Sequence, residues 1–191
     1  GDVAAKLLHF SFIFWLIALV YLLSRDWFQA PKEITSQISV SSMAKNSWTA
    51  VLILISMPMV LNLGAQAYND LPLAFYQVAA LVTLLRWRQN EQSGWLILSG
   101  ILCGLSMGLK YTSFIDPLLL ASFVIWHFWQ KETQAAAGLL TVPPGGSAGT
   151  PATAQVPSLK LRAFAWKKTF KPLLTLTGAT TLIALPWYLK N

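Results

Sequence analysis

The stretch AYNDLPLAFYQVAALVTLLRWRQNEQSGWLILSGILCGLSMGLKYT (67–112) decides how this chain folds. It contains two apolar segments, about 71–87 and 95–109, joined by a short polar link that includes QNEQSG. A lone charge stands at each end of the stretch, Asp70 at one and Lys110 at the other. A charge between long apolar segments is costly when it faces lipid, so both residues are candidate functional residues.

The composition points to a membrane protein. Hydrophobic residues make up 55% of the chain and charged residues 11%, which leaves too little polar surface for a soluble domain of 191 residues. Several apolar runs approach the roughly 20 residues that cross a bilayer, and they are continuous rather than alternating. The single Cys103 lies inside such a run, so it supports neither a disulfide framework nor a metal site. We predict an all-α, polytopic transmembrane helical bundle.

Six spans are predicted, all within one partial transmembrane domain that covers residues 1–191. Because the chain begins at Gly1 and ends in LPWYLKN, we expect it to be an internal piece of a longer protein. Residues 132–158 are rich in Pro, Gly, Ala and Thr, which predicts a flexible cytoplasmic linker. The spans are about 7–24, 48–67, 71–87, 95–109, 112–129 and 173–189.

The loop charges predict the topology. Eleven of the 14 lysines and arginines fall in three alternate loops, which the positive-inside rule places in the cytoplasm. The turns that hold Asp70 and Lys110 then both lie on the outer face, so we expect the two charges in one site. Basic residues interleaved with Phe and Trp in KLRAFAWKKTFK (160–171) suit an anionic inner leaflet, which favours the lipid bilayer as partner over nucleic acid.

Asp70 has two compatible interpretations. It precedes Leu71 and Pro72, as a helix N-cap does, and a cap uses one carboxylate oxygen and leaves the other free for chemistry. Tyr68 and Asn69 add polar groups beside it.

Upstream of Asp70, polar amides recur along the second predicted span. Asn62, Gln66 and Asn69 stand four and three residues apart, which predicts one polar helix face toward the bundle interior. Pro58 is expected to kink this span about two turns earlier.

The fourth span has two distinct faces. Gly100, Gly104 and Gly108 form a tandem small-xxx-small pattern that lets a neighbouring helix approach closely, so we assign them to packing. A second face carries a stripe of small, weakly polar side chains that ends in an ammonium group. Its members are Ser99, Cys103, Ser106 and Lys110.

Lys110 either snorkels to the lipid headgroups or holds an anionic ligand such as a lipid phosphate. Its place directly after GLSMGL and before Tyr111 and Thr112 favours the second interpretation. Asp116, six residues further on, either pairs with Lys110 or caps the helix that restarts at Pro117.

Three segments carry a family resemblance: PMVLNLGAQAYNDLPLAFY, GWLILSGILCGLSMGLKYTSFIDPLLL and LPWYLKN. Together they resemble the GT-C membrane glycosyltransferases of the protein O-mannosyltransferase and aminoarabinose transferase branch. The resemblance implies a multi-pass enzyme of the plasma (inner) membrane with its active site on the extracytoplasmic side. It implies transfer of a sugar from a polyprenyl-phosphate donor to an acceptor protein or glycolipid.

The resemblance also implies roles for residues. Asp70 matches an acidic residue that helps build the active site and can contact a divalent metal ion. Lys110 matches a lysine placed to hold the lipid phosphate, with Tyr111, Tyr68 and Asn69 as further donor-binding candidates. The family's catalytic base lies in an earlier outer loop, so this piece alone is expected to be inactive.

Two other functions remain open at this point. A transporter or lipid-linked oligosaccharide flippase would also have several spans, a buried lysine and a kinked helix. A non-catalytic membrane scaffold would tolerate substitution of Asp70 and Lys110.

Overall fold

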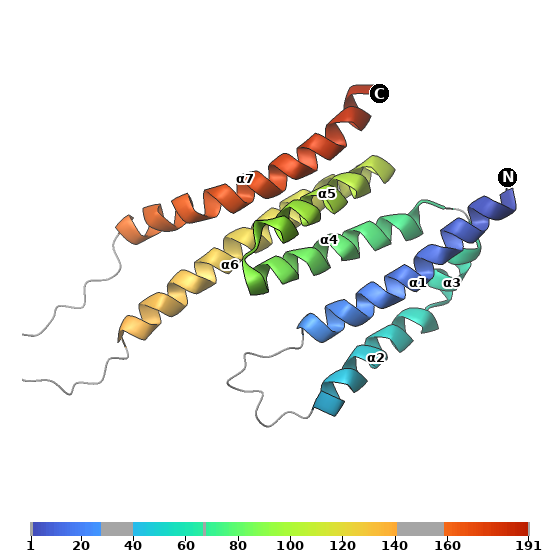
Figure 1. The fold of residues 1–191 in the computed structure, drawn as a ribbon, viewed down its shortest axis with the longest axis horizontal. Coiled ribbons are helices and arrows are strands. Elements are labelled where there is room, and N and C mark those ends of the chain that lie inside the picture. The colour runs from blue at the N-terminus through green and yellow to red at the C-terminus, as the bar shows by residue number, and fades with distance from the viewer. Residues whose placement is uncertain (1, 28–39, 67, 141–158, 191) are drawn as a thin grey trace, which may run out of the picture.

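The computed structural model describes residues 2–27, 40–66, 68–140 and 159–190, and within these ranges it contains helices and no strands (Figure 1). The predicted all-α class is therefore confirmed. The elements are α1 (Asp2–Trp27), α2 (Val40–Ser56), α3 (Pro58–Ala65), α4 (Asp70–Asn90), α5 (Ser93–Leu109), the 3₁₀ helix η2 (Tyr111–Phe114), α6 (Ile115–Leu140) and α7 (Leu159–Lys190).

Three helical segments among the described residues are long and apolar enough to cross a membrane: Val3–Arg25, Tyr111–Gln134 and Thr169–Lys190. A fourth span arises if α2 and α3, which meet at an angle of 64°, count as one broken helix. The break falls at Met57, whose backbone is extended because the residue before a proline disfavours helical geometry. The kink predicted at Pro58 is thus confirmed.

The remaining predicted spans are also helical. α5 is apolar but has 17 residues, and α4 carries Arg86 and Arg88 close to its end. α6 continues to Leu140, so residues 132–140 are helical where the composition predicts a linker. The rest of that predicted linker, 141–158, lies outside the described residues.

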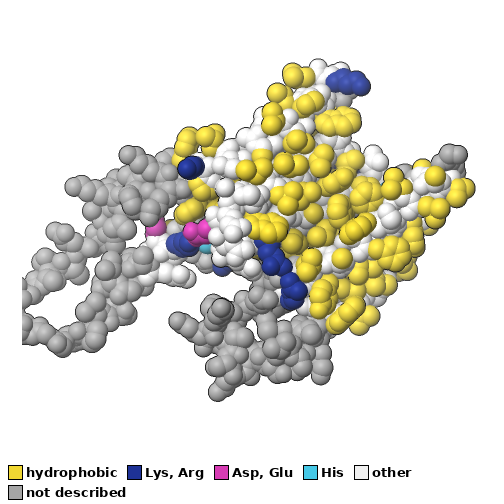
Figure 2. All heavy atoms as spheres, viewed as in Figure 1, with side chains coloured by type: hydrophobic (Ala, Val, Ile, Leu, Met, Phe, Trp, Pro, Cys, Tyr) yellow, Lys and Arg dark blue, Asp and Glu magenta, His cyan; other side chains and the backbone are white. Residues whose placement is uncertain are grey.

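α5 lies at the centre of the packing, with α4 on one side and α7 on another, while α1 packs on α4 and α2 (Figure 1). Leu84, Leu96, Val124 and Leu176 come from four different helices and are fully buried together. Hydrophobic side chains also cover much of the molecular surface seen in Figure 2, as a surface that contacts lipid requires.

The glycines of α5 lie against α7. A Cβ atom on Gly100 would stand 2.7 Å from the Leu176 carbonyl oxygen, and one on Gly104 would stand 2.7 Å from Ile183 Cβ. At Gly108 the nearest atom would be Trp187 Nε1, at 3.0 Å. The close helix approach predicted from the glycine spacing is therefore confirmed, and it fixes the end of α5 that precedes Lys110.

A two-residue turn reverses the chain between α4 and α5. Glu91 ends α4 in the left-handed conformation, with φ 52°, and its N–H donates to the Trp87 carbonyl. Its carboxylate pairs with Lys131 of α6. The reversal makes α4 and α5 antiparallel, so the start of α4 and the end of α5 lie at the same end of the bundle.

The polar face of α5 contacts α4 through Ser99, whose hydroxyl donates to the Ala80 carbonyl at 2.8 Å. We expect Ser99→Ala to lower the free energy of unfolding by about 0.6 kcal/mol, a typical value for a hydrogen bond between membrane helices. Unfolding in mixed micelles measures this, with Ser122→Ala, whose hydroxyl bonds within its own helix, as control. A loss above about 2 kcal/mol would contradict a typical strength for this bond.

Candidate functional site

Asp70 and Lys110 form an ion pair at one end of the bundle. Lys110 Nζ lies 2.8 Å from Asp70 Oδ1, although the residues are 40 positions apart in the chain. The Lys110 side chain is 49% exposed and the Asp70 side chain 43%, so the pair is open to a ligand. The structure thus brings together the two charges that the loop pattern predicts on one face.

Asp70 is the first residue of α4, and Asn69 holds the N-cap position without a side-chain hydrogen bond. The prediction that Asp70 is itself the cap is therefore wrong. The chain enters the helix one residue earlier, since Leu73 N–H already donates to the Asn69 carbonyl at 3.0 Å. The carboxylate instead faces Lys110, and the positive end of the helix dipole favours its charge.

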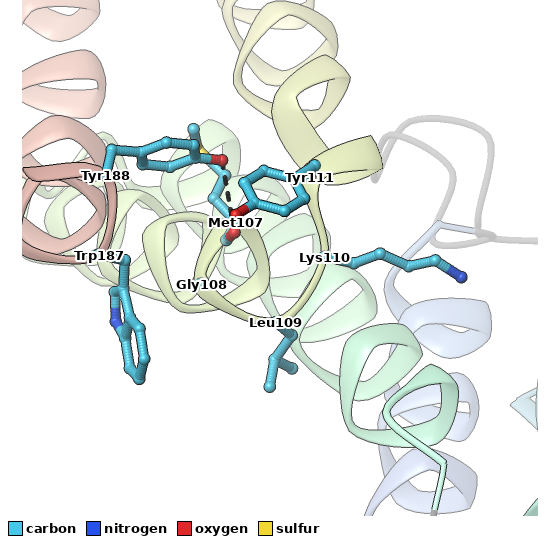
Figure 3. A pocket seen from close by; sticks show the side chains of 7 residues that line it. All are labelled: Met107, Gly108, Leu109, Lys110, Tyr111, Trp187 and Tyr188. Carbon is cyan, nitrogen blue, oxygen red and sulfur yellow. Dashed lines mark hydrogen bonds between the residues drawn. The ribbon is translucent and has the colours of Figure 1, made fainter. Parts of the chain in front are cut away.

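Lys110 stands where α5 stops and the backbone becomes extended, with φ −152° and ψ 133°. Its N–H donates to the Ser106 carbonyl at 3.3 Å, and its own carbonyl accepts from Ser113 N–H at 3.1 Å. The side chain points away from Trp187 and Tyr188 of α7 (Figure 3). It therefore reaches across the end of the hairpin to α4.

A small pocket of about 100 Å³ lies behind the Lys110 backbone, between the end of α5 and the end of α7 (Figure 3). The Tyr111 and Tyr188 rings meet edge to face with centroids 6.0 Å apart, and Tyr188 Oη lies 3.5 Å from the Met107 carbonyl oxygen. Trp187 also lines this pocket. The segment LPWYLKN thus supplies an aromatic wall to this pocket, which the pattern of isolated charges did not predict.

The other predicted donor-binding residues lie beside the pair in the chain. Tyr68 and Tyr111 are exposed, at 58% and 72%, and Asn69 is exposed in the turn before α4. The predicted polar face is interrupted, because α3 ends at Ala65. Gln66 and Asn62 bond to each other at 3.0 Å, but Asn69 no longer continues their helix.

Asp116 takes neither of the two roles that the sequence left open, since it does not pair with Lys110 and it lies in the first turn of α6, which begins at Ile115. Its carboxylate accepts from Gln77 Nε2 at 3.0 and 3.2 Å and lies 3.1 Å from Ser106 Oγ, while Lys110 pairs with Asp70. Gln77 was missed, although a lone amide inside LPLAFYQVAALVTLL was a usable signal. The structure therefore shows a second polar cluster below the ion pair.

The ion pair adds little to stability. Half-exposed pairs contribute about 0–1 kcal/mol because water screens them and ordering two side chains costs entropy. A ligand phosphate would replace the carboxylate as partner of the ammonium at small cost, since phosphate forms equally strong charge-assisted hydrogen bonds. The arrangement suits an exchangeable anion site.

The divalent metal ion that the resemblance implies at Asp70 stays a prediction. No group of three or more His, Cys, Asp or Glu side chains comes together in the part of the chain that the structure describes. Asp70 also faces an ammonium group, which disfavours a second cation on the same carboxylate oxygen.

A sequence profile of the dolichyl-phosphate-mannose-protein mannosyltransferases matches residues 9–143, which include both charges and most of the helices. Searches of curated proteins and of solved structures gave no match. The match favours a membrane glycosyltransferase over a transporter or a scaffold. Because the profile covers well over half of the sequence and the helices suit a bilayer, this chain belongs to the dolichyl-phosphate-mannose-protein mannosyltransferase family of GT-C membrane glycosyltransferases.

Proposed function

We propose that this chain forms the donor side of a sugar-transfer site, in which Lys110 binds the phosphate of a polyprenyl-phosphate sugar. The observation that carries the proposal is the 2.8 Å contact between Lys110 Nζ and Asp70, half exposed at the end of the bundle. The ammonium is held in place by a weak partner that a phosphate can displace.

Each residue has a defined part in the proposed reaction. Transfer breaks the bond between the sugar's anomeric carbon and a phosphate oxygen, and the negative charge on the leaving phosphate grows. The Lys110 ammonium stabilises that charge. Asp70, released from Lys110, accepts a hydrogen bond from a hydroxyl of donor or acceptor and so orients the reactants. Tyr68, Asn69 and Tyr111 border the donor.

The proposed site faces the extracytoplasmic side of the plasma (inner) membrane. Support comes from the described basic residues Arg25, Arg86, Arg88 and Lys131, which lie toward the opposite ends of their helices from the Asp70–Lys110 pair. The positive-inside rule places such residues in the cytoplasm. A lipid-linked donor would then meet its acceptor, a protein or glycolipid, outside.

Asp70→Asn tests the proposal in the intact protein. We expect kcat to fall about 100-fold, because the amide is a weaker hydrogen-bond acceptor than the carboxylate. The KM for polyprenyl-phosphate mannose should stay level or fall, because Lys110 loses a competing partner. Initial rates in proteoliposomes measure both constants.

Thermal unfolding of Asp70→Asn supplies the control. The pair and the helix dipole together contribute about 1 kcal/mol, so the midpoint should move little. Normal turnover combined with a clearly lower midpoint would mean that Asp70 only stabilises the start of α4.

A further inference from the structure

Asp116 anchors a small closed loop that contains Lys110. Ser106, in the last turn of α5, and Asp116, in the first turn of α6, lie 3.1 Å apart through Oγ and Oδ2. The residues between them comprise the end of α5, the extended Lys110 and η2. The Ser106 hydroxyl also lies 2.7 Å from the Cys103 carbonyl oxygen, so it shares its proton between that carbonyl and the Asp116 carboxylate. Lys110 lies at the tip of the loop that this shared bond closes.

The base of this loop is also tied to α4. Gln77 Nε2 donates to both oxygens of the Asp116 carboxylate, at 3.0 and 3.2 Å. Gln77 lies seven residues after Asp70 on the same helix, about 10 Å along its axis. The three side chains thus join the helix that carries Asp70 to the loop that carries Lys110.

Backbone bonds continue this connection to Lys110 itself. The Ser106 carbonyl accepts the Lys110 N–H, and the Lys110 carbonyl accepts the Ser113 N–H. α4 also contacts α6 near its other end, where the Trp87 ring meets the rings of His127 and Phe128, whereas the polar cluster lies toward the end that carries Asp70. The polar cluster is therefore placed to set the separation between the tip of the loop and the start of α4.

We propose that Asp116 is a positioning residue, which holds the Lys110 ammonium opposite Asp70 by closing the 106–116 loop onto Gln77. This inference deepens the proposed function and rests on it for its consequence in catalysis. An isosteric amide at position 116 presents one acceptor oxygen where the carboxylate presents two, and it turns an N–H₂ group toward another donor. The loop base then loosens and Lys110 samples positions away from Asp70.

The test uses Asp116→Asn and zero-length carbodiimide cross-linking, which joins Asp70 to Lys110 only when their side chains touch. Mass spectrometry of the digested protein quantifies the cross-linked peptide. We expect its yield to fall about tenfold, the equilibrium effect of losing a hydrogen bond to a charged group. The KM for polyprenyl-phosphate mannose should rise by a similar factor, with a smaller change in kcat.

Thr83→Val is the matched control, because Thr83 is a buried polar residue of α4 that bonds only to carbonyls of its own helix. Its cross-link yield should equal that of the wild type. If Asp116→Asn does not accumulate, Ser106→Ala opens the loop base while keeping the Gln77–Asp116 bonds, and it should give a smaller loss in the same direction. Wild-type cross-linking in a folded Asp116→Asn or Ser106→Ala protein would overturn the inference.

The cross-link also separates this inference from the proposed function. If Lys110→Ala leaves donor KM unchanged, the phosphate-binding role fails. A reduced cross-link in Asp116→Asn would then still support positioning of Lys110 by Asp116.

Discussion

Replacing Lys110 with alanine should lower the rate of sugar transfer by about 10²–10³-fold, the effect of removing one preorganised group that stabilises transition-state charge. The ammonium stands at the tip of a fixed loop, and among the described residues that line the pocket behind it Lys110 is the one cation. The leaving phosphate would therefore lose its main cationic partner. Initial rates with polyprenyl-phosphate mannose in proteoliposomes measure the loss, and donor KM should rise.

Lys110→Arg is the matched control for charge. If the side chain only snorkels to the headgroups, arginine should replace lysine with full activity, because both reach the interface. If it binds phosphate in a fixed position, the longer planar group should restore donor binding more than kcat. Normal turnover in Lys110→Ala at normal expression would refute the assignment. The opposite KM changes expected in Lys110→Ala and Asp70→Asn distinguish the two residues.

Gly104→Leu should lower the free energy of unfolding by about 2–3 kcal/mol, the usual cost of overpacking a tight contact. A Cβ atom at this position already meets Ile183 Cβ at 2.7 Å and the Thr180 carbonyl oxygen at 2.8 Å. Backbone cannot move aside as a flexible side chain can, so α5 must separate from α7. Titration with SDS in mixed micelles, followed by tryptophan fluorescence, measures the loss.

Gly178→Leu is the matched control, because it is the same substitution on the partner helix where nothing lies within 4 Å of an added Cβ. It should change stability by less than about 0.5 kcal/mol. Equal effects of the two substitutions would contradict the packing of α5 against α7. Gly104→Leu should also reduce transfer, since Lys110 lies less than two turns beyond the displaced glycine.

Features that repeat with the period of a helix could be predicted from the sequence. The i, i+4 spacing of Gly100, Gly104 and Gly108 predicts a tight helix contact because residues four apart share a face. The structure adds that α7 is the helix that fills it, through residues such as Ile183. Spacing identifies a face but carries no information about the partner.

Polar side chains were harder to assign. The carboxylate of Asp116 lies six residues from Lys110, yet its hydrogen-bond partners are Gln77 and Ser106. Proximity in sequence was misleading here, because η2 turns the chain between the two residues. The assignment of Asp70 as the N-cap was also wrong, because it depends on the residue at which the backbone becomes helical. In the structure that point lies one residue earlier, so Asn69 takes the cap position.

The sequence alone determined that this protein is a helical membrane protein and that Asp70 and Lys110 belong at one end of it. Apolar run length and the distribution of loop charges are properties of the chain in order, and a bilayer acts on them directly. Only the tertiary structure decided that the two charges touch and that Gln77 and Asp116 support them. Those contacts depend on the rotation and depth of packed helices, which are set by the fit of side chains between α4, α5 and α7.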